Sequence, residues 1–150
     1  MSAVSLATIR GRIKTAIETI TDSGLKESPL PFQSFGRTPN SIGDKSFSIG
    51  ILNTVSTEDR QKSSIGTLCE TQIQIQMSYR LRPMGMLSDV DNALNLESSI
   101  ITRMVNGDSE TISFPNLQII FQNVQRNLTA SGEYMLSNIN FKILHYLPLT

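Results

Sequence analysis

The 150-residue sequence has no tryptophan, one cysteine, one histidine and no excess of charge of either sign. One cysteine excludes an internal disulfide and a cysteine-rich zinc site. One histidine excludes any mechanism that needs two imidazoles. Because 13 Lys and Arg balance 13 Asp and Glu, the chain lacks the bulk positive charge on which non-specific nucleic-acid binding depends. No run approaches the roughly 20 apolar residues of a membrane-spanning helix, so we expect no membrane contact.

Length and composition indicate one globular domain over residues 1–150. Domains typically hold about 100–200 residues, and a chain of this size buries roughly 68–70% of its unfolded surface. The 39% of apolar residues are too many for a disordered chain. The N-terminus has neither the basic start nor the apolar run of a signal peptide. We therefore expect the chain to reside in a cytoplasm, where a lone thiol stays reduced.

The N-terminal third predicts a helix and then a long loop. Apolar residues recur every three or four positions from Leu6 to Ile20, which predicts an amphipathic helix. Gly11 inside it costs about 1 kcal/mol relative to alanine. Three prolines and two glycines predict a loop over residues 25–46. Two interpretations of this long loop remain open. In one, Phe32 and Phe35 are buried and hold it on the protein surface, and in the other the loop docks onto a partner chain.

Alternating residues predict a long β-hairpin. Residues 46–55 form its first strand, and the charged segment Thr57–Ser64 forms a solvated tip. From Glu70 to Arg82 polar residues occupy every second position and, apart from Thr71, the positions between them are apolar or aromatic, which predicts a strand with one buried face. At about 3.3 Å per residue this strand spans ~40 Å, the diameter of a domain of this size. It therefore crosses the domain or protrudes, and a protruding edge needs a cover because exposed edges pair with other chains.

The second half repeats the order of helix and strand pair. Ser88 is expected to begin a helix that ends at Asn106, with Asp89 and Asp91 in its first turn and a capping box formed by Ser88 and Asp91. Glu97 is the polar interruption on the apolar face of this helix.

Two further strands follow the second helix. Residues 117–124 predict a strand whose slip in phase marks a bulge, and residues 127–132 predict a turn. The final strand places five side chains on one face: Ile139, Phe141, Ile143, His145 and Leu147. The whole order predicts an α+β fold, with a mainly antiparallel sheet and two helices packed on one face.

No group of residues predicts catalysis or a bound cofactor. His145 lies in phase with apolar neighbours and is most simply a structural residue. Cys69 has no base that the sequence places beside it, although a nucleophilic cysteine needs one. The acidic pairs lack the pattern of a calcium loop, and no glycine-rich phosphate loop exists. We expect a protein that is not an enzyme, with no catalytic, metal-binding or cofactor-binding residues.

Side chains at strand ends and turns are the candidate contacts with other subunits. Arg80 and Arg82, at the end of the long strand, are either solvated, paired with carboxylates or part of an interface. Met84, Met86 and Leu87 either cap the second helix or contact a partner, because methionine adapts to irregular surfaces. The full candidate set comprises Glu58, Asp59, Arg60, Arg80, Arg82, Met84 and Met86.

The layout has four parts: the helix Leu6–Ile20, the run Glu70–Arg82 after a charged turn, the acidic-headed helix Ser88–Asn106, and a final pair that carries Arg126–Tyr134 and closes on Phe141–Leu144. In this layout, over nearly its whole length, the chain resembles the tail terminator (tail-completion) proteins of tailed bacteriophages. The resemblance implies a non-catalytic virion protein of the tail or neck, assembled in the host cytoplasm. Such proteins form a homohexameric ring that caps the tail tube and stops its polymerisation.

The implied partners are the major tail tube protein, the head-proximal neck or connector protein, and passing DNA in passive contact only. Because an overrunning strand can pair with a neighbour, we expect the long strand to form the seam between subunits. Glu58, Asp59, Arg80 and Arg82 would set the rotational register, since charges fix specificity more than affinity. Two alternatives remain open: another head-to-tail junction protein, such as a stopper or tail-tube relative, and a small ligand-binding α+β domain.

Overall fold

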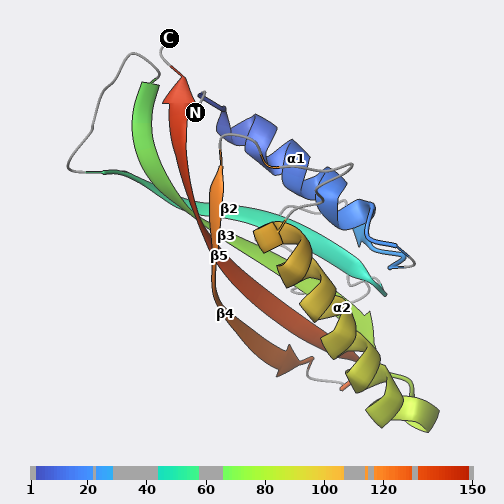
Figure 1. Ribbon diagram of the computed structural model, residues 1–150. Helices are drawn as coiled ribbons and strands as arrows, with labels where there is room; N and C mark the ends of the chain where they lie inside the picture. The colour runs from blue at the N-terminus through green and yellow to red at the C-terminus, as the bar shows by residue number, and fades with distance from the viewer. Residues whose placement is uncertain are drawn as a thin grey trace.

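The computed structural model describes residues 3–21, 23–28, 44–57, 66–106, 114, 117–129 and 132–148. These residues form a two-layer α+β fold in which helices cover one face of a five-stranded sheet (Figure 1), as the sequence predicts. In chain order the elements are α1 (Leu6–Glu18), β1 (Lys26–Glu27), β2 (Ser46–Ser56), β3 (Gly66–Arg80), the 3-10 helix η2 (Pro83–Gly85), α2 (Met86–Asn106), β4 (Gln118–Leu128) and β5 (Tyr134–Pro148).

The sheet has the strand order β1-β2-β3-β5-β4. Neighbouring strands are antiparallel, except for the short parallel contact of β1 with β2. β3 and β5 are the two central strands and pair along their full lengths, from Gly66 opposite Pro148 to Arg80 opposite Tyr134. The long alternating strand of the sequence is therefore hydrogen-bonded on both sides.

The core lies between the helices and the sheet. The helices contribute the fully buried side chains Ile9, Ile13, Ile17, Ile100 and Met104. The strands contribute Phe47, Ile73, Ile75, Met77, Ile139, Phe141 and Ile143. These residues are the apolar periods of the sequence, so periodicity alone predicts which faces are buried.

α1 follows its sequence pattern closely. Ser5 caps its N-terminus, and the Ser5 hydroxyl accepts a hydrogen bond of 3.2 Å from the Thr8 amide. The helix ends at Glu18, two residues before the expected Ile20. An added Cβ at Gly11 would meet no other atom within 4 Å, so this glycine serves no close approach within the described residues.

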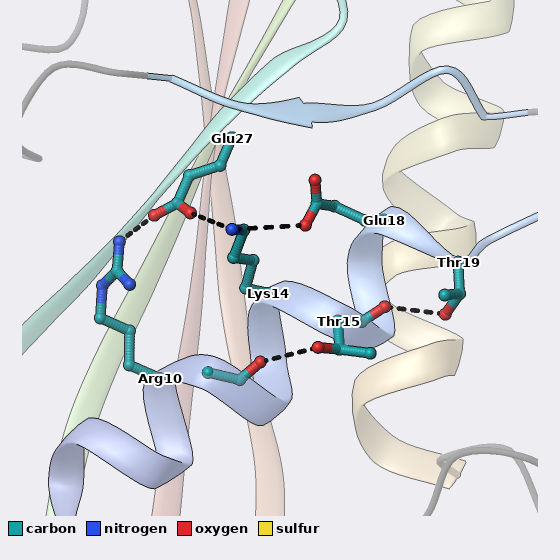
Figure 2. A network of polar contacts seen from close by, with 7 residues as sticks. Arg10, Lys14, Thr15, Glu18, Thr19 and Glu27 are labelled. Atoms are coloured by element: carbon teal, nitrogen blue, oxygen red, sulfur yellow. Dashed lines mark hydrogen bonds and ion pairs between the residues drawn. The ribbon is translucent and has the colours of Figure 1, made fainter.

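β1 corrects the expectation that residues 25–46 form a loop throughout. Lys26 and Glu27 pair in parallel with Ser46 and Phe47 of β2. Although β1 has only two residues, its Glu27 also contacts the helix layer. Figure 2 shows Glu27 between two basic side chains of α1, with an ion pair to Arg10 and one of 3.6 Å to Lys14. Such pairs are individually weak, but here they connect β1 to the helix layer.

The rest of that segment, residues 29–43, lies outside the described residues. It contains Phe32 and Phe35, so neither expectation for these two side chains is tested.

β3 begins at Gly66, four residues before the expected start, and ends at Arg80, two residues before the expected end. Its alternation is confirmed, with Cys69, Ile73 and Met77 buried toward the helices. The polar face is half-buried and not freely solvated, because a central strand has neighbours on both sides. On that face the Gln74 amide donates to Asn140 at 2.9 Å.

α2 starts at Met86, so Ser88 is not its cap and the expected capping box with Asp91 is absent. The 3-10 helix η2 begins at Pro83, directly before α2, so helical structure starts earlier in the chain than expected. Proline favours this start because it fits the first position of a helix. Asp89 lies in the first turn of α2, as expected, and its carboxylate accepts a hydrogen bond from the Arg82 amide.

The final strand pair carries the predicted bulge, between Phe121 and Asn123 of β4. β4 continues to Leu128, so the turn is shorter than the expected 127–132. The Gly132 amide closes it by donating to the Thr129 carbonyl at 2.9 Å. Among the described residues no helix is both long enough and apolar enough to cross a membrane.

Candidate functional site

The only cysteine and the only histidine are neighbours in space. β3 places Cys69 directly opposite His145 of β5, a proximity that the sequence did not predict. Both side chains are buried. A 2.6 Å hydrogen bond links His145 Nε2 to Thr71 Oγ1, and the Cys69 thiol donates to the Thr67 carbonyl at 3.4 Å.

The electrostatics of this pair oppose nucleophilic chemistry. Burial raises the pKa of Cys69. Burial also lowers the pKa of His145, and a backbone hydrogen bond with Tyr146 opposes that shift only in part. A reactive cysteine needs the reverse, a thiolate beside a cationic or basic imidazole. We therefore interpret Cys69 and His145 as core residues.

A second polar cluster joins α2 to the sheet. The Glu97 carboxylate is 3% exposed and accepts hydrogen bonds from Arg126 Nε at 3.0 and 3.2 Å and from Ser137 Oγ at 2.9 Å. The same contact raises the pKa of Arg126. All oxygen positions of Glu97 are thus used inside the protein, which makes this cluster structural. Within the described segments no group of three potential ligands is placed to hold a metal ion.

The candidate arginines have different environments. Arg82 is paired with Asp89, at 2.8 Å from Nη2 to Oδ1 and 3.1 Å from Nε to Oδ2. The Arg82 amide adds a third bond of 2.8 Å to the same carboxylate. These bonds lower the pKa of Asp89. Arg80 is exposed, and its backbone amide donates to the Asp44 carboxylate at 3.0 Å.

The apolar residues after β3 do not fold back onto α2. Met84 is 99% exposed and Leu87 83%, and Met86 is exposed as well. The expectation that these side chains cap the helix is therefore wrong, and the alternative, contact with a partner, remains a prediction. They lie at one extremity of the molecule, where α2 begins (Figure 1). Glu58, Asp59 and Arg60 lie outside the described residues.

The two lateral edges of the sheet are further candidate contact surfaces. β4 is an edge strand of 11 residues, and no described strand pairs with its outer side. On the other side, β1 covers only Ser46 and Phe47 of β2. Exposed apolar side chains lie on both strands: Leu52, Val55, Ile120, Phe121 and Leu128.

The edges also lack charged residues, which natural proteins use to prevent strand pairing. β2 contains no charged residue, and the only one in β4 is Arg126, already bound to Glu97. Each edge strand does carry a bulge, a device that limits edge pairing: one lies between Ile51 and Asn53 of β2 and one between Phe121 and Asn123 of β4. The expectation that the long strand forms a seam is wrong, because β3 has strands on both sides and offers a neighbour no free edge. β4 and the part of β2 after Phe47 each have an edge that no other described strand covers.

The comparisons with known proteins identify no family. The sequence matches no model of a known protein family. It also has no significant match among curated proteins.

Proposed function

We propose that this protein is a virion structural protein of the tail terminator type. In this role it forms a ring on the end of the tail tube, stops further tube polymerisation and provides the joint to the head-proximal neck. The observation that carries the proposal is a pair of strand edges on opposite sides of one sheet, β4 and the part of β2 after Phe47, which no other described strand covers. Their one charged side chain, Arg126, is paired with Glu97.

Two different free edges on one chain favour a head-to-tail contact between copies. When β4 of one copy pairs with β2 of the next, every copy both gives and receives the same contact. Such a heterologous contact produces a closed ring when the rotation between copies closes. The edges suit this pairing because each carries exposed apolar side chains, such as Leu52 on β2 and Ile120 on β4.

A ring subunit of this kind needs no catalytic group. It has to offer one face to the tube and another to the neck, and the exposed apolar extremity at Met84, Met86 and Leu87 is suited to such an axial contact. Another head-to-tail junction protein would use the same edges. The two roles differ in whether the ring binds the end of the tail tube or the portal-side ring.

The test is the mass of the purified 16.6 kDa chain by light scattering, alone and with tail tubes of the phage that encodes it, followed by electron microscopy. We expect a hexameric ring, or a ring that forms only on one tube end. Ile120→Lys, which places a charge on the β4 edge, should abolish the ring. Thr102→Lys, with the same charge on the exposed side of α2, should not.

A monodisperse monomer that ignores tubes would overturn the proposal. A ring that binds only portal-side components would instead support the alternative that the protein is a stopper. A ring unaffected by Ile120→Lys would remove the β4 edge from the argument.

A further inference from the structure

A polar groove runs beside α2 and contains two cations, Lys45 and Arg80, that pair with no carboxylate of the described residues. It consists of two adjoining cavities of about 420 Å³ and about 360 Å³, which share Lys45 and Tyr79 in their walls. The first is lined by Asp44, Lys45, Tyr79, Arg80, Arg82 and Asp89. The second continues along α2, past Asn92, Asn95 and Ser99.

The backbone holds Lys45 in this position. Lys45 has a φ of 52°, in the left-handed region that non-glycine residues occupy at a cost. Its carbonyl accepts a hydrogen bond of 3.1 Å from the Lys26 amide of β1. Its aliphatic stem passes over Gly24, where an added Cβ would lie 3.4 Å from Lys45 Cδ. The ammonium then lies 6.0 Å from the centre of the Tyr79 ring.

The charges in the first cavity do not cancel locally. Asp89 is occupied by its three hydrogen bonds from Arg82. Asp44 receives the backbone amide of Arg80 and not its guanidinium. Across the part of the chain that the structure describes, neither the Lys45 ammonium nor the Arg80 guanidinium pairs with a carboxylate. The groove thus has two available cations on a protein with no net charge.

We propose that this groove binds an extended, carboxylate-bearing segment of a partner polypeptide. The carboxylate lies between Lys45 and Arg80 and accepts hydrogen bonds from both. Such bonds between ionised groups are stronger than those between neutral groups. The flanking backbone of the segment lies along α2, because the side-chain amides of Asn92 and Asn95 offer both donors and acceptors to peptide groups. The proposal holds whether or not the chain forms a ring.

A peptide carboxylate fits better than a phosphate group. Asp44 and Asp89 line the same cavity, and two carboxylates repel a dianion more strongly than a monoanion. The second cavity has no cation besides the shared Lys45 among its lining residues, and hydroxyl and amide groups line most of it. Such a surface suits a neutral peptide backbone next to one acidic side chain.

The test is a chemical-shift titration of the full chain at low salt with the acetylated and amidated peptide Gly-Ala-Gly-Asp-Ala-Gly. Its twin with asparagine in place of the aspartate is the matched ligand control. We expect saturable shifts at Gly24, Lys45 and Tyr79 with a dissociation constant of ~1 mM, at least tenfold weaker binding of the twin, and weaker binding at high salt.

Two variants locate the site. Lys45→Gln should weaken binding of the aspartate peptide about tenfold, and Arg80→Gln should do the same without touching the contact between Lys45 and β1. Lys26→Gln removes an equal charge from the exposed side of β1 and should leave binding unchanged.

The proposal is overturned if the aspartate peptide shows no saturation, if both peptides bind equally, or if neither groove variant weakens binding. Tighter binding of inorganic phosphate than of the aspartate peptide would also overturn it. Because no outcome depends on rings or tubes, failure here is distinguishable from failure of the proposed assembly.

Discussion

His145 Nε2 lies 2.6 Å from Thr71 Oγ1, and Thr71 Oγ1 lies 3.0 Å from Thr54 Oγ1. The three residues form a polar row across β5, β3 and β2, at the end of the sheet where α1 begins. His145 Nδ1 is buried and meets no partner of normal geometry among the described residues. A proton added to this imidazole would create a buried charge that the backbone of Tyr146 compensates only in part.

We therefore predict that the protein loses stability as the pH falls below about 6.5, the ordinary histidine pKa. The folded state holds a lowered pKa for His145 because of burial, so the unfolded chain binds the proton first. For one histidine the slope reaches at most about 1.4 kcal/mol per pH unit. Chemical unfolding between pH 5 and 8 should show this slope in the wild type and a flatter one in His145→Gln. Equal slopes would contradict the assignment.

The contact of Arg82 with Asp89 predicts a second loss of stability on acidification, in a lower pH range. Because the hydrogen bonds from Arg82 lower the pKa of Asp89, this contribution to stability is complete above about pH 3.9 and disappears as the pH falls through the lowered value. Asp89→Asn should destabilise the protein at pH 7, and the difference from the wild type should shrink near pH 3. The control is Asp91→Asn. Asp91 is exposed and lies two positions further along the same helix, so its substitution should have little effect.

The Glu97–Arg126 pair predicts a non-additive mutant cycle. Arg126→Leu leaves the buried Glu97 carboxylate with Ser137 as its remaining described partner, and removing one member of a buried pair costs about 3–5 kcal/mol. Arg126 is 47% exposed, so we expect the lower end of that range. The double variant Glu97→Leu with Arg126→Leu should be clearly more stable than Arg126→Leu alone. Additive losses in urea unfolding would show that the two side chains act independently.

Two glycines predict opposite effects of alanine. A Cβ at Gly66, whose φ is 155°, would lie 2.0 Å from the Leu147 carbonyl oxygen. Gly66→Ala should therefore destabilise the start of β3 by at least about 1–3 kcal/mol. Gly11→Ala meets no atom within 4 Å and should stabilise α1 by about 0.5–1 kcal/mol. Thermal unfolding of both variants checks the pair, and a stabilising Gly66→Ala would refute the close contact.

Much of the fold is predictable from periodicity. The helix spacing of α1 and the alternation in β3 and β5 predict both the elements and their buried faces, because a period of two or 3.6 specifies which side chains share a side. The bulge in β4 is visible as a slip in phase for the same reason. Boundaries are less predictable, as the early start of α2 shows, because Pro83 and the Arg82–Asp89 contact act together.

The sites are less predictable than the fold. Cys69 and His145 are neighbours only because β3 pairs with β5, and the pairing order of strands is a tertiary property that no local pattern contains. β1 is held by side chains of α1, a contact that its own two residues do not signal. Lys45 is an unremarkable lysine in the sequence, and its position in the groove depends on Gly24 and β1. Charge and exposure at strand ends indicated Arg80 and Arg82 but not the groove that they line.

The position of β5 at the centre of the sheet has a consequence for biosynthesis. β3 needs β5 as its second neighbour, and paired residues such as Thr71 and His145 are 74 positions apart in the chain. Contacts of such high sequence separation close slowly, and a chain emerging from the ribosome cannot form them until its last strand has been translated. During that interval β3 has an open side in addition to the two edges of the finished sheet. The nascent chain is therefore most prone to mispairing before translation of β5 is complete, and protection by a chaperone would matter most at that stage.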